Sequence, residues 1–219
     1  MGAAPRFADL PAEIAIFPLA GALLLPHGRL PLNIFEPRYL AMVEDALGAG
    51  RLFGMIQPDP ALPEGPAGPG LYHIGCLGRI ASFSETDDGR YLISLAGMVR
   101  FRVAQEQAPR RGYRVVRAAY DGFADDLAPP DAGGVSRAAL LGALAGYFTA
   151  RGLEANQDTL RQMPDAMLPL TLAMACPFDP AEKQALLEAP TPAARAATLL
   201  ALLQMGSHER DDDAHRNVS

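Results

Sequence analysis

A change of pattern near the middle of the chain constrains its fold more than any other feature. From Ile14 to about Tyr120, β-branched and aromatic residues occur in short runs separated by glycine, which is typical of strands and turns. Beyond residues 121–134, which are rich in proline, glycine and acidic residues, apolar residues recur at helical spacing. Strands followed by helices predict an α+β chain rather than alternating β–α units.

The β-rich half also contains signals for one hairpin, one helix and one loop. Asp87-Asp88-Gly89-Arg90 suits a tight primed turn between strands at 80–86 and 91–96. A helix is expected over 37–48, because Pro37 fits a first helical turn and Glu36 places a carboxylate at the positive end of the helix dipole. Residues 58–70 contain five prolines and three glycines, so they predict a loop.

The second half predicts a bundle of helices. Apolar residues from Leu140 to Phe148 form one stripe, 159–163 and 165–175 follow as helices, and two more begin at Asp179 and Thr191. Asp179, Pro180 and Glu182 form a capping-box pattern. The expected organisation is a β-rich subdomain at 1–120, a linker at 121–134, a helical bundle at 135–205 and a disordered tail at 206–219.

Several short motifs, in order along the chain, resemble one family. They are Ile16-Phe17-Pro18-Leu19, Leu30 to Tyr39, Arg51 to Gly54, Gly75 to Ile80, Gly97 to Arg102, and Glu182 to Glu188 with Arg195. They are similar to the N-terminal substrate-recognition domain of the Lon (La) ATP-dependent proteases, over about residues 13 to 205. The resemblance implies a PUA-like β pseudobarrel with one inserted helix, followed by a C-terminal helical bundle.

The catalytic signatures of a complete Lon protease are missing from this sequence. A P-loop needs the pattern G-x-x-x-x-G-K-[ST], and the one lysine, Lys183, follows no glycine loop. A serine–lysine dyad would need Lys183 in an apolar site, but its neighbours Glu182, Gln184 and Glu188 predict a solvated helix face. We therefore expect no enzymatic activity and no cofactor.

Composition is that of a globular cytoplasmic protein. Apolar residues make up 49% of the chain, and neither a signal peptide nor a run of the ~20 apolar residues of a membrane span occurs. Cys76 and Cys176 lie in apolar contexts and predict buried free thiols. No metal site is expected, because His208 and His215 fall in the polar tail, and no catalytic role is assigned to the histidines.

The charge distribution argues against a nucleic acid as the partner. The net charge of −6 repels a polyphosphate at long range. A local basic patch around Arg100, Arg102 and residues 110–117 stays open, but Arg100 and Arg102 more simply form the wet face of a half-buried strand.

The function implied by the resemblance is a non-catalytic protein- or peptide-binding module. Its expected partners are unfolded or damaged proteins, or a separate protease that processes them. The sequence leaves open whether the chain forms a homo-oligomer. The residues add one candidate peptide-binding segment, Leu23, Leu24 and Leu25, since one strand face cannot hide all three leucines; core packing is the alternative for them. The alternative function is RNA binding, because some PUA-like pseudobarrels bind RNA.

Overall fold

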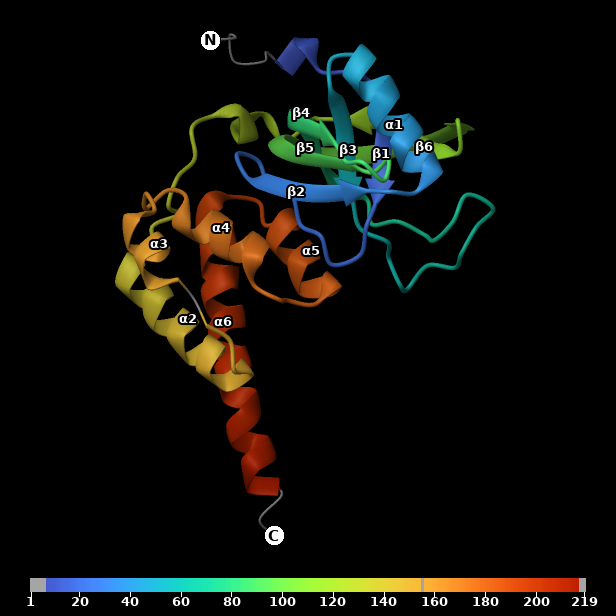
Figure 1. Cartoon of the computed structure of the whole chain (residues 1–219). Helices are drawn as coiled ribbons and strands as arrows, with labels where there is room; N and C mark the ends of the chain where they lie inside the picture. The colour runs from blue at the N-terminus through green and yellow to red at the C-terminus, as the bar shows by residue number, and fades with distance from the viewer. Residues whose placement is uncertain (1–6, 155, 217–219) are drawn as a thin grey trace. The chain divides into compact units, whose positions relative to one another are not determined.

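The computed structural model describes residues 7–154 and 156–216. It divides into two compact units, residues 1–129 and 130–219, which we call the β unit and the helical unit (Figure 1). The division falls inside the segment 121–134. Each unit is described by itself below.

From residue 7 onward, the β unit consists of six strands, one α-helix and two short 3-10 helices. In chain order they are η1 (Phe7–Asp9), β1 (Glu13–Pro18), β2 (Arg29–Ile34), α1 (Pro37–Gly48), β3 (Leu52–Ile56), β4 (Ile74–Glu85), β5 (Tyr91–Arg110), β6 (Tyr113–Ala119) and η2 (Ala124–Leu127). The strand order is β2-β5-β4-β3-β1-β6. Among the described strands, β1 and β3 pair in parallel, and the other neighbouring strands pair antiparallel.

The sheet curls back on itself through its longest strand. The first part of β5 pairs with β2, and its last part, from Arg102 onward, pairs with β6. The result is a curled sheet rather than a closed barrel, so the predicted α+β pseudobarrel with one inserted helix is confirmed.

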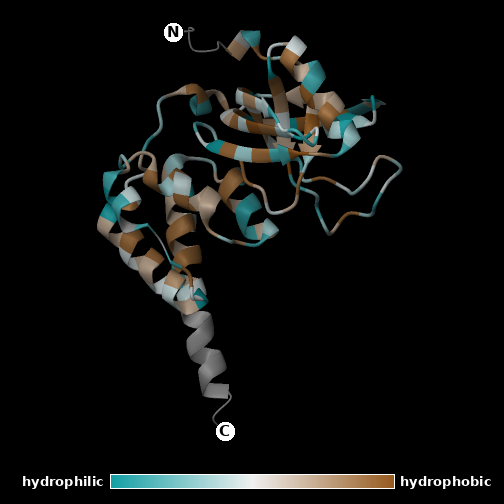
Figure 2. Cartoon of the chain, in the orientation of Figure 1, coloured by the Kyte–Doolittle hydropathy of each residue, from teal (hydrophilic) through white to brown (hydrophobic). Residues whose placement is uncertain are grey.

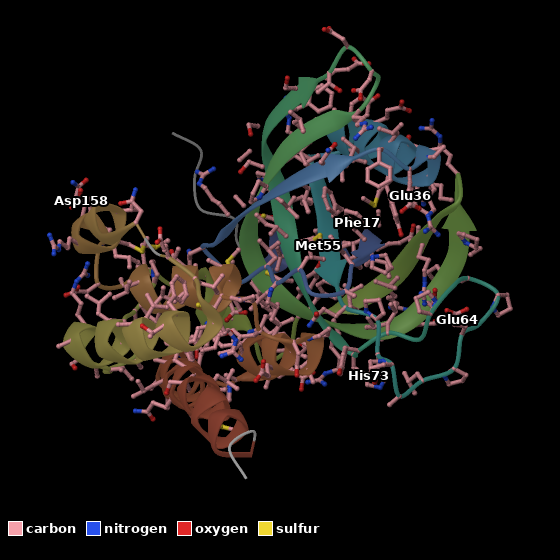
Figure 3. All side chains as sticks on the ribbon, turned by 60° about the horizontal axis from the view of Figure 1, so that its bottom comes forward. Phe17, Glu36, Met55, Glu64, His73 and Asp158 are labelled. Atoms are coloured by element: carbon pink, nitrogen blue, oxygen red, sulfur yellow. The ribbon has the colours of Figure 1, made fainter. Side chains whose placement is uncertain are left out.

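The core of the β unit lies inside this curl. Figure 3 shows Phe17 and Met55 within the ring of strands, and both are buried. Two glycines let the sheet close tightly around Phe101, because a Cβ added at Gly54 or Gly75 would lie 2.7 or 2.6 Å from its ring. Real Cβ atoms essentially never approach so closely, so these positions require glycine.

The local predictions in this unit are largely confirmed. Helix α1 begins at Pro37 and ends at Gly48, and residues 58–70 lie in the loop between β3 and β4. The hairpin is present, but its turn differs: the N–H of Gly89 donates to the carbonyl of Thr86, and among the four turn residues only Gly89 has positive φ, +76°. This is a type I turn followed by a left-handed glycine, not a primed turn.

Two predictions about polar residues of the β unit need correction. Arg100 is 4% exposed rather than on a wet face, because Asp126 pairs with it. The first part of the expected linker is built into the unit, since Phe123, which precedes η2, and Asp126 within η2 are both buried.

The described part of the helical unit contains five helices: α2 (Arg137–Arg151), α3 (Gln157–Gln162), α4 (Leu168–Ala175), α5 (Pro180–Glu188) and α6 (Pro192–Arg216). Helix α2 packs along α6, and Figure 2 shows that the first turns of α6 are mostly apolar. The capping box of α5 is confirmed: Asp179 Oδ1 accepts from the N–H of Glu182 at 2.7 Å, and Glu182 Oε2 accepts from the N–H of Asp179 at 2.9 Å.

The predicted disordered tail at 206–219 is wrong for residues 206–216, which continue α6. Gly206 is packed against α2: Arg151 Nη1 donates to its carbonyl at 2.6 Å, and an added Cβ would meet the ring of Tyr147 at 2.7 Å. A helix held there extends readily, because each further residue adds a hydrogen bond without a new nucleation step. Residues 217–219 lie outside the described residues.

The prediction of a solvated Lys183 is also wrong. Lys183 is 8% exposed and Gln184 is 3% exposed. Lys183 precedes Leu186 and Leu187 by three and four positions, so it shares their buried helix face. Burial lowers the pKa of its amine. The two thiols follow the prediction, since Cys76 in the β unit and Cys176 in the helical unit are free and buried.

Candidate protein-binding surface

The structure places Leu23, Leu24 and Leu25 in the core. They are 1%, 1% and 0% exposed. The side chain of Leu24 lies against Gly78 and Gly97, where an added Cβ would approach it to 2.9 and 3.3 Å. Core packing, the alternative that the sequence left open, describes these leucines, and they offer no exposed surface to a peptide.

Two exposed apolar side chains lie instead at the end of β2 and on β5. Phe35, which follows β2, is 61% exposed, and Leu92 on β5 is 46% exposed. Phe83 on β4, 39% exposed, pairs with buried Ile93 and so lies on the opposite side of the sheet. Because side chains alternate along a strand, buried Leu32 and Ile93 direct their neighbours away from the core. We call this exposed side the outer face; it comprises Pro31, Asn33, Phe35, Ser82, Ser84, Leu92 and Ser94.

The register brings these residues into rows across three strands. Leu92 pairs with Asn33 of β2 on one side and with Ser84 of β4 on the other. The next row joins Pro31, Ser94 and Ser82, beside an irregularity of β4 between Ile80 and Ser82. Such a bulge increases the local twist of the sheet.

A groove of about 540 Å³ runs along these strands. Its lining residues are Pro31, Leu32, Asn33, Ser82, Phe83, Ser84, Leu92, Ile93 and Ser94. None of them is charged. The serine hydroxyls and the Asn33 amide both donate and accept hydrogen bonds, so the groove suits an uncharged extended segment with its own backbone polar groups.

Three exposed arginines border this surface: Arg90 near Phe35, and Arg29 and Arg79, which both pair in register with Ala96 in the row beyond Pro31 and Ser94. Arg90 is already neutralised. The guanidinium of Arg90 lies 5.9 Å from the centre of the Phe35 ring, and its Nε lies 2.8 Å from Asp88 Oδ2. Both partners of this ion pair are exposed, so it contributes little to stability.

Strand β2 is an edge of the sheet, and Pro31 alters that edge. The N–H of Gly97 donates to the carbonyl of Gly28, and the same register continues along β2. The antiparallel alternation therefore directs the backbone groups of Pro31 and Asn33 away from β5. Proline lacks an N–H, so this edge is a poor template for an added strand, and a ligand is expected to bind through side chains.

Most arginines of the basic patch considered in the sequence form ion pairs with carboxylates. Arg110 contacts Glu13, Arg111 contacts Glu44 and Asp45, and Arg114 contacts Glu106. These carboxylates neutralise the cations that a phosphate backbone would need.

Other kinds of site find no support in the described part of the chain. No group of three or more His, Cys, Asp or Glu side chains there could hold a metal ion. Among the described residues, no helix is long and apolar enough to cross a membrane. The side chains of His208 and His215, the two histidines of the polar tail, are not among those that the structure describes.

Comparison with known proteins identifies related chains. The model of the ATP-dependent protease La (LON) substrate-binding domain matches residues 13–205. Lon protease 2 of Myxococcus xanthus is 29% identical over 109 residues, covering 49% of this chain and 13% of that protease. Lon protease 2 of Sorangium cellulosum is 36% identical over 93 residues, or 42% of this chain and 11% of that protease. The chain thus matches about an eighth of the length of these relatives.

Solved structures show the same fold. A Lon N-terminal domain protein from Xanthomonas campestris is 24% identical, with a TM-score of 0.57 over 86% of this chain and 97% of that chain. The N-terminal domain of the Mycobacterium avium complex Lon protease is 14% identical, with a TM-score of 0.58 over 90% of this chain and 98% of that chain.

Proposed function

Because the chain belongs to the ATP-dependent protease La (LON) substrate-binding domain family, we propose that it binds apolar segments of unfolded or damaged proteins without catalysing a reaction. The outer face of β2, β4 and β5 is the proposed contact surface. A separate protease that processes the bound proteins is the proposed downstream partner.

The observation that carries this proposal is the uncharged groove lined by exposed Leu92, on strands whose edge member, β2, is followed by exposed Phe35. Large apolar side chains on a solvent-facing strand cost solubility and contribute nothing to the core, so their grouping suggests a protein contact. Burying them under a ligand would contribute roughly 25 cal/mol per Å² of apolar area.

The chemistry of the buried Lys183 supports a non-catalytic role. A lysine of lowered pKa is a potential base, and Cys176 is its electrostatic neighbour. Burial, however, raises the pKa of the Cys176 thiol to about 11. A thiol held neutral and 1% exposed is not an activated nucleophile.

A binding titration tests the proposal. The ligand is a reduced, carboxymethylated model protein that stays unfolded, and a generic RNA serves as the competing class of ligand. Affinity for the unfolded protein should change little between 50 and 500 mM salt, because apolar burial is not screened. RNA binding would weaken by roughly a thousandfold or more for six phosphate contacts.

Two variants locate the surface. Phe35→Ser with Leu92→Ser should weaken binding to the unfolded protein by about tenfold or more, with an unchanged melting temperature. Leu62→Ser is the matched control, because Leu62 is 43% exposed but lies in the loop 58–70. Equal binding by the double variant and the control would show that the outer face is not the binding site. Salt-sensitive RNA binding, without binding of the unfolded protein, would show that the chain binds RNA instead.

A further inference from the structure

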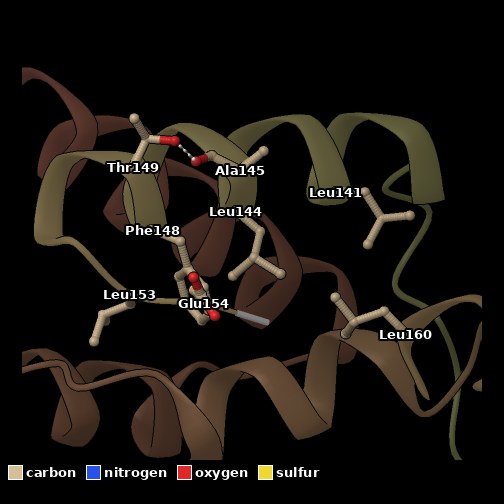
Figure 4. A pocket seen from close by; sticks show the side chains of 8 residues that line it. All are labelled: Leu141, Leu144, Ala145, Phe148, Thr149, Leu153, Glu154 and Leu160. Atoms are coloured by element: carbon tan, nitrogen blue, oxygen red, sulfur yellow. Dashed lines mark hydrogen bonds between the residues drawn. The ribbon is translucent and has the colours of Figure 1, made fainter. Parts of the chain in front are cut away.

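The helical unit contains a separate pocket of about 330 Å³ beside α2 (Figure 4). Its lining residues come from α2, the segment that follows it and α3: Leu141, Leu144, Ala145, Phe148, Thr149, Leu153, Glu154 and Leu160. This volume is at the lower end of the range of ligand pockets. The walls are mostly aliphatic or aromatic, so they suit an apolar group.

Glu154 is the one charged residue among those lining residues. Figure 4 shows it beside Phe148, in the space below α2. Its carboxylate makes no hydrogen bond or ion pair with the residues that the structure describes. The other polar side chain, Thr149, already donates its hydroxyl to the carbonyl of Ala145 at 2.8 Å. Within the described residues, the pocket therefore combines apolar walls with a carboxylate that has no cationic partner.

We infer that this pocket binds an apolar side chain next to a lysine or arginine in a non-native protein segment. The apolar side chain would contact Leu144, Phe148 and Leu160, and the cation would pair with Glu154. The inference rests on the proposed function, because it assumes a protein ligand, and it adds a second site with a different preference. The groove of the β unit selects against charge, whereas this pocket selects for an adjacent positive charge.

Short capped peptides test the preference on the full chain. Three fluorescent peptides share a leucine-rich centre and differ at one position, which is lysine, norleucine or glutamate. Binding should follow that order, with the lysine peptide about threefold tighter than the norleucine peptide at low salt, the size expected for an exposed ion pair. High salt should remove the difference.

Glu154→Gln should abolish the lysine preference while leaving norleucine binding unchanged. Asp158→Asn is the matched control, because it removes the same charge from an exposed side chain of α3 outside the lining. Leu153→Ser, at a 40% exposed wall residue, should weaken all three peptides by a few fold. Melting curves check that each variant is folded.

The inference is overturned if Glu154→Gln and Asp158→Asn behave alike, if glutamate and lysine peptides bind equally, or if no peptide binds. Such a failure is distinct from a failure of the proposed function. The proposed function is judged separately, by the effect of Phe35→Ser with Leu92→Ser on binding of the unfolded protein. That measurement does not depend on the lysine preference of the peptides.

Discussion

Arg100 of β5 and Asp126 of η2 form a buried, two-pronged ion pair. Arg100 Nε lies 2.8 Å from Asp126 Oδ2, and Arg100 Nη2 lies 2.9 Å from Oδ1. The backbone N–H of Arg100 also donates to Oδ2 at 2.9 Å. The ring of Phe123 lies 4.8 Å from the guanidinium carbon. These contacts hold η2, near the C-terminal end of the β unit, against strand β5.

Breaking this pair should destabilise the β unit. Asp126→Asn leaves a buried guanidinium without its counter-charge, which costs about 3–5 kcal/mol. The melting temperature should fall by roughly 10 °C. Asp125→Asn, at the exposed neighbour, is the control and should have almost no effect. An unchanged melting temperature for Asp126→Asn would mean that the pair is open to solvent.

The leucines at 23–25 should matter for stability rather than for binding. Leu25→Ala removes a fully buried side chain and should cost about 2–5 kcal/mol in denaturant unfolding. Leu92→Ala, at 46% exposure, should leave stability within about 0.5 kcal/mol. The reverse order of the two effects would place the leucine segment on the surface.

Two glycines should respond to alanine in opposite directions. A Cβ at Gly97 would lie 2.0 Å from the carbonyl oxygen of Leu25, which is backbone and cannot move aside cheaply. Gly97→Ala should therefore cost about 3 kcal/mol or more. A Cβ at Gly142 in α2 meets nothing within 4 Å, so Gly142→Ala should stabilise by about 1 kcal/mol, through helix propensity. Thermal unfolding of both variants measures this.

Brief proteolysis with an unspecific protease should cut in loops and in the linker, and not within the helices and strands of the proposed β-rich subdomain and helical bundle. Residues 61–67 are all exposed and should be cut first. The second cut is expected near 128–131, because η2 is anchored and Gly133 packs closely on the carbonyl of Pro192. Mass spectrometry of the fragments identifies the sites. Early cleavage inside α1 or α4 would contradict their placement.

Alkaline pH should destabilise the chain through Cys176. Burial raises the pKa of its thiol to about 11, against about 8.5 in an unfolded chain. The unfolded state therefore loses this proton first, and the stabilising contribution, complete below pH 8.5, is lost as the pH rises to about 11. The loss amounts to about 3 kcal/mol.

Burial lowers the pKa of Lys183, so its titration changes the free energy of unfolding in the opposite direction as the pH rises. The contribution of Cys176 is therefore measured as the difference between the wild type and a variant without the thiol. Unfolding free energies of the wild type and Cys176→Ala should converge as the pH rises from 8 to 11. A constant difference would show that the thiol titrates normally in the folded protein.

Local signals in the sequence were sufficient wherever the cause of a structure lies within a few residues. Pro37 begins α1, Asp179 and Glu182 cap α5, and Gly89 supports the hairpin. Each depends on backbone preferences or on hydrogen bonds over one helical turn.

Burial of charged side chains could not be predicted in the same way. Arg100 is buried by a partner 26 positions away, and Lys183 by the packing of α5 against other helices. The outer face was missed for a related reason: Asn33 and Leu92 become neighbours only through the register of β2 on β5. Alternation in 91–96 signals an exposed Leu92, but not which residues lie beside it.

The two cysteines have a practical consequence. Cys76 belongs to the β unit and Cys176 to the helical unit, and both are buried without a disulfide. A thiol reagent therefore reaches each one only when its own unit opens. Timing the two alkylations separately, peptide by peptide, would report on each unit's unfolding from a single unlabelled sample, and would distinguish one cooperative transition from two.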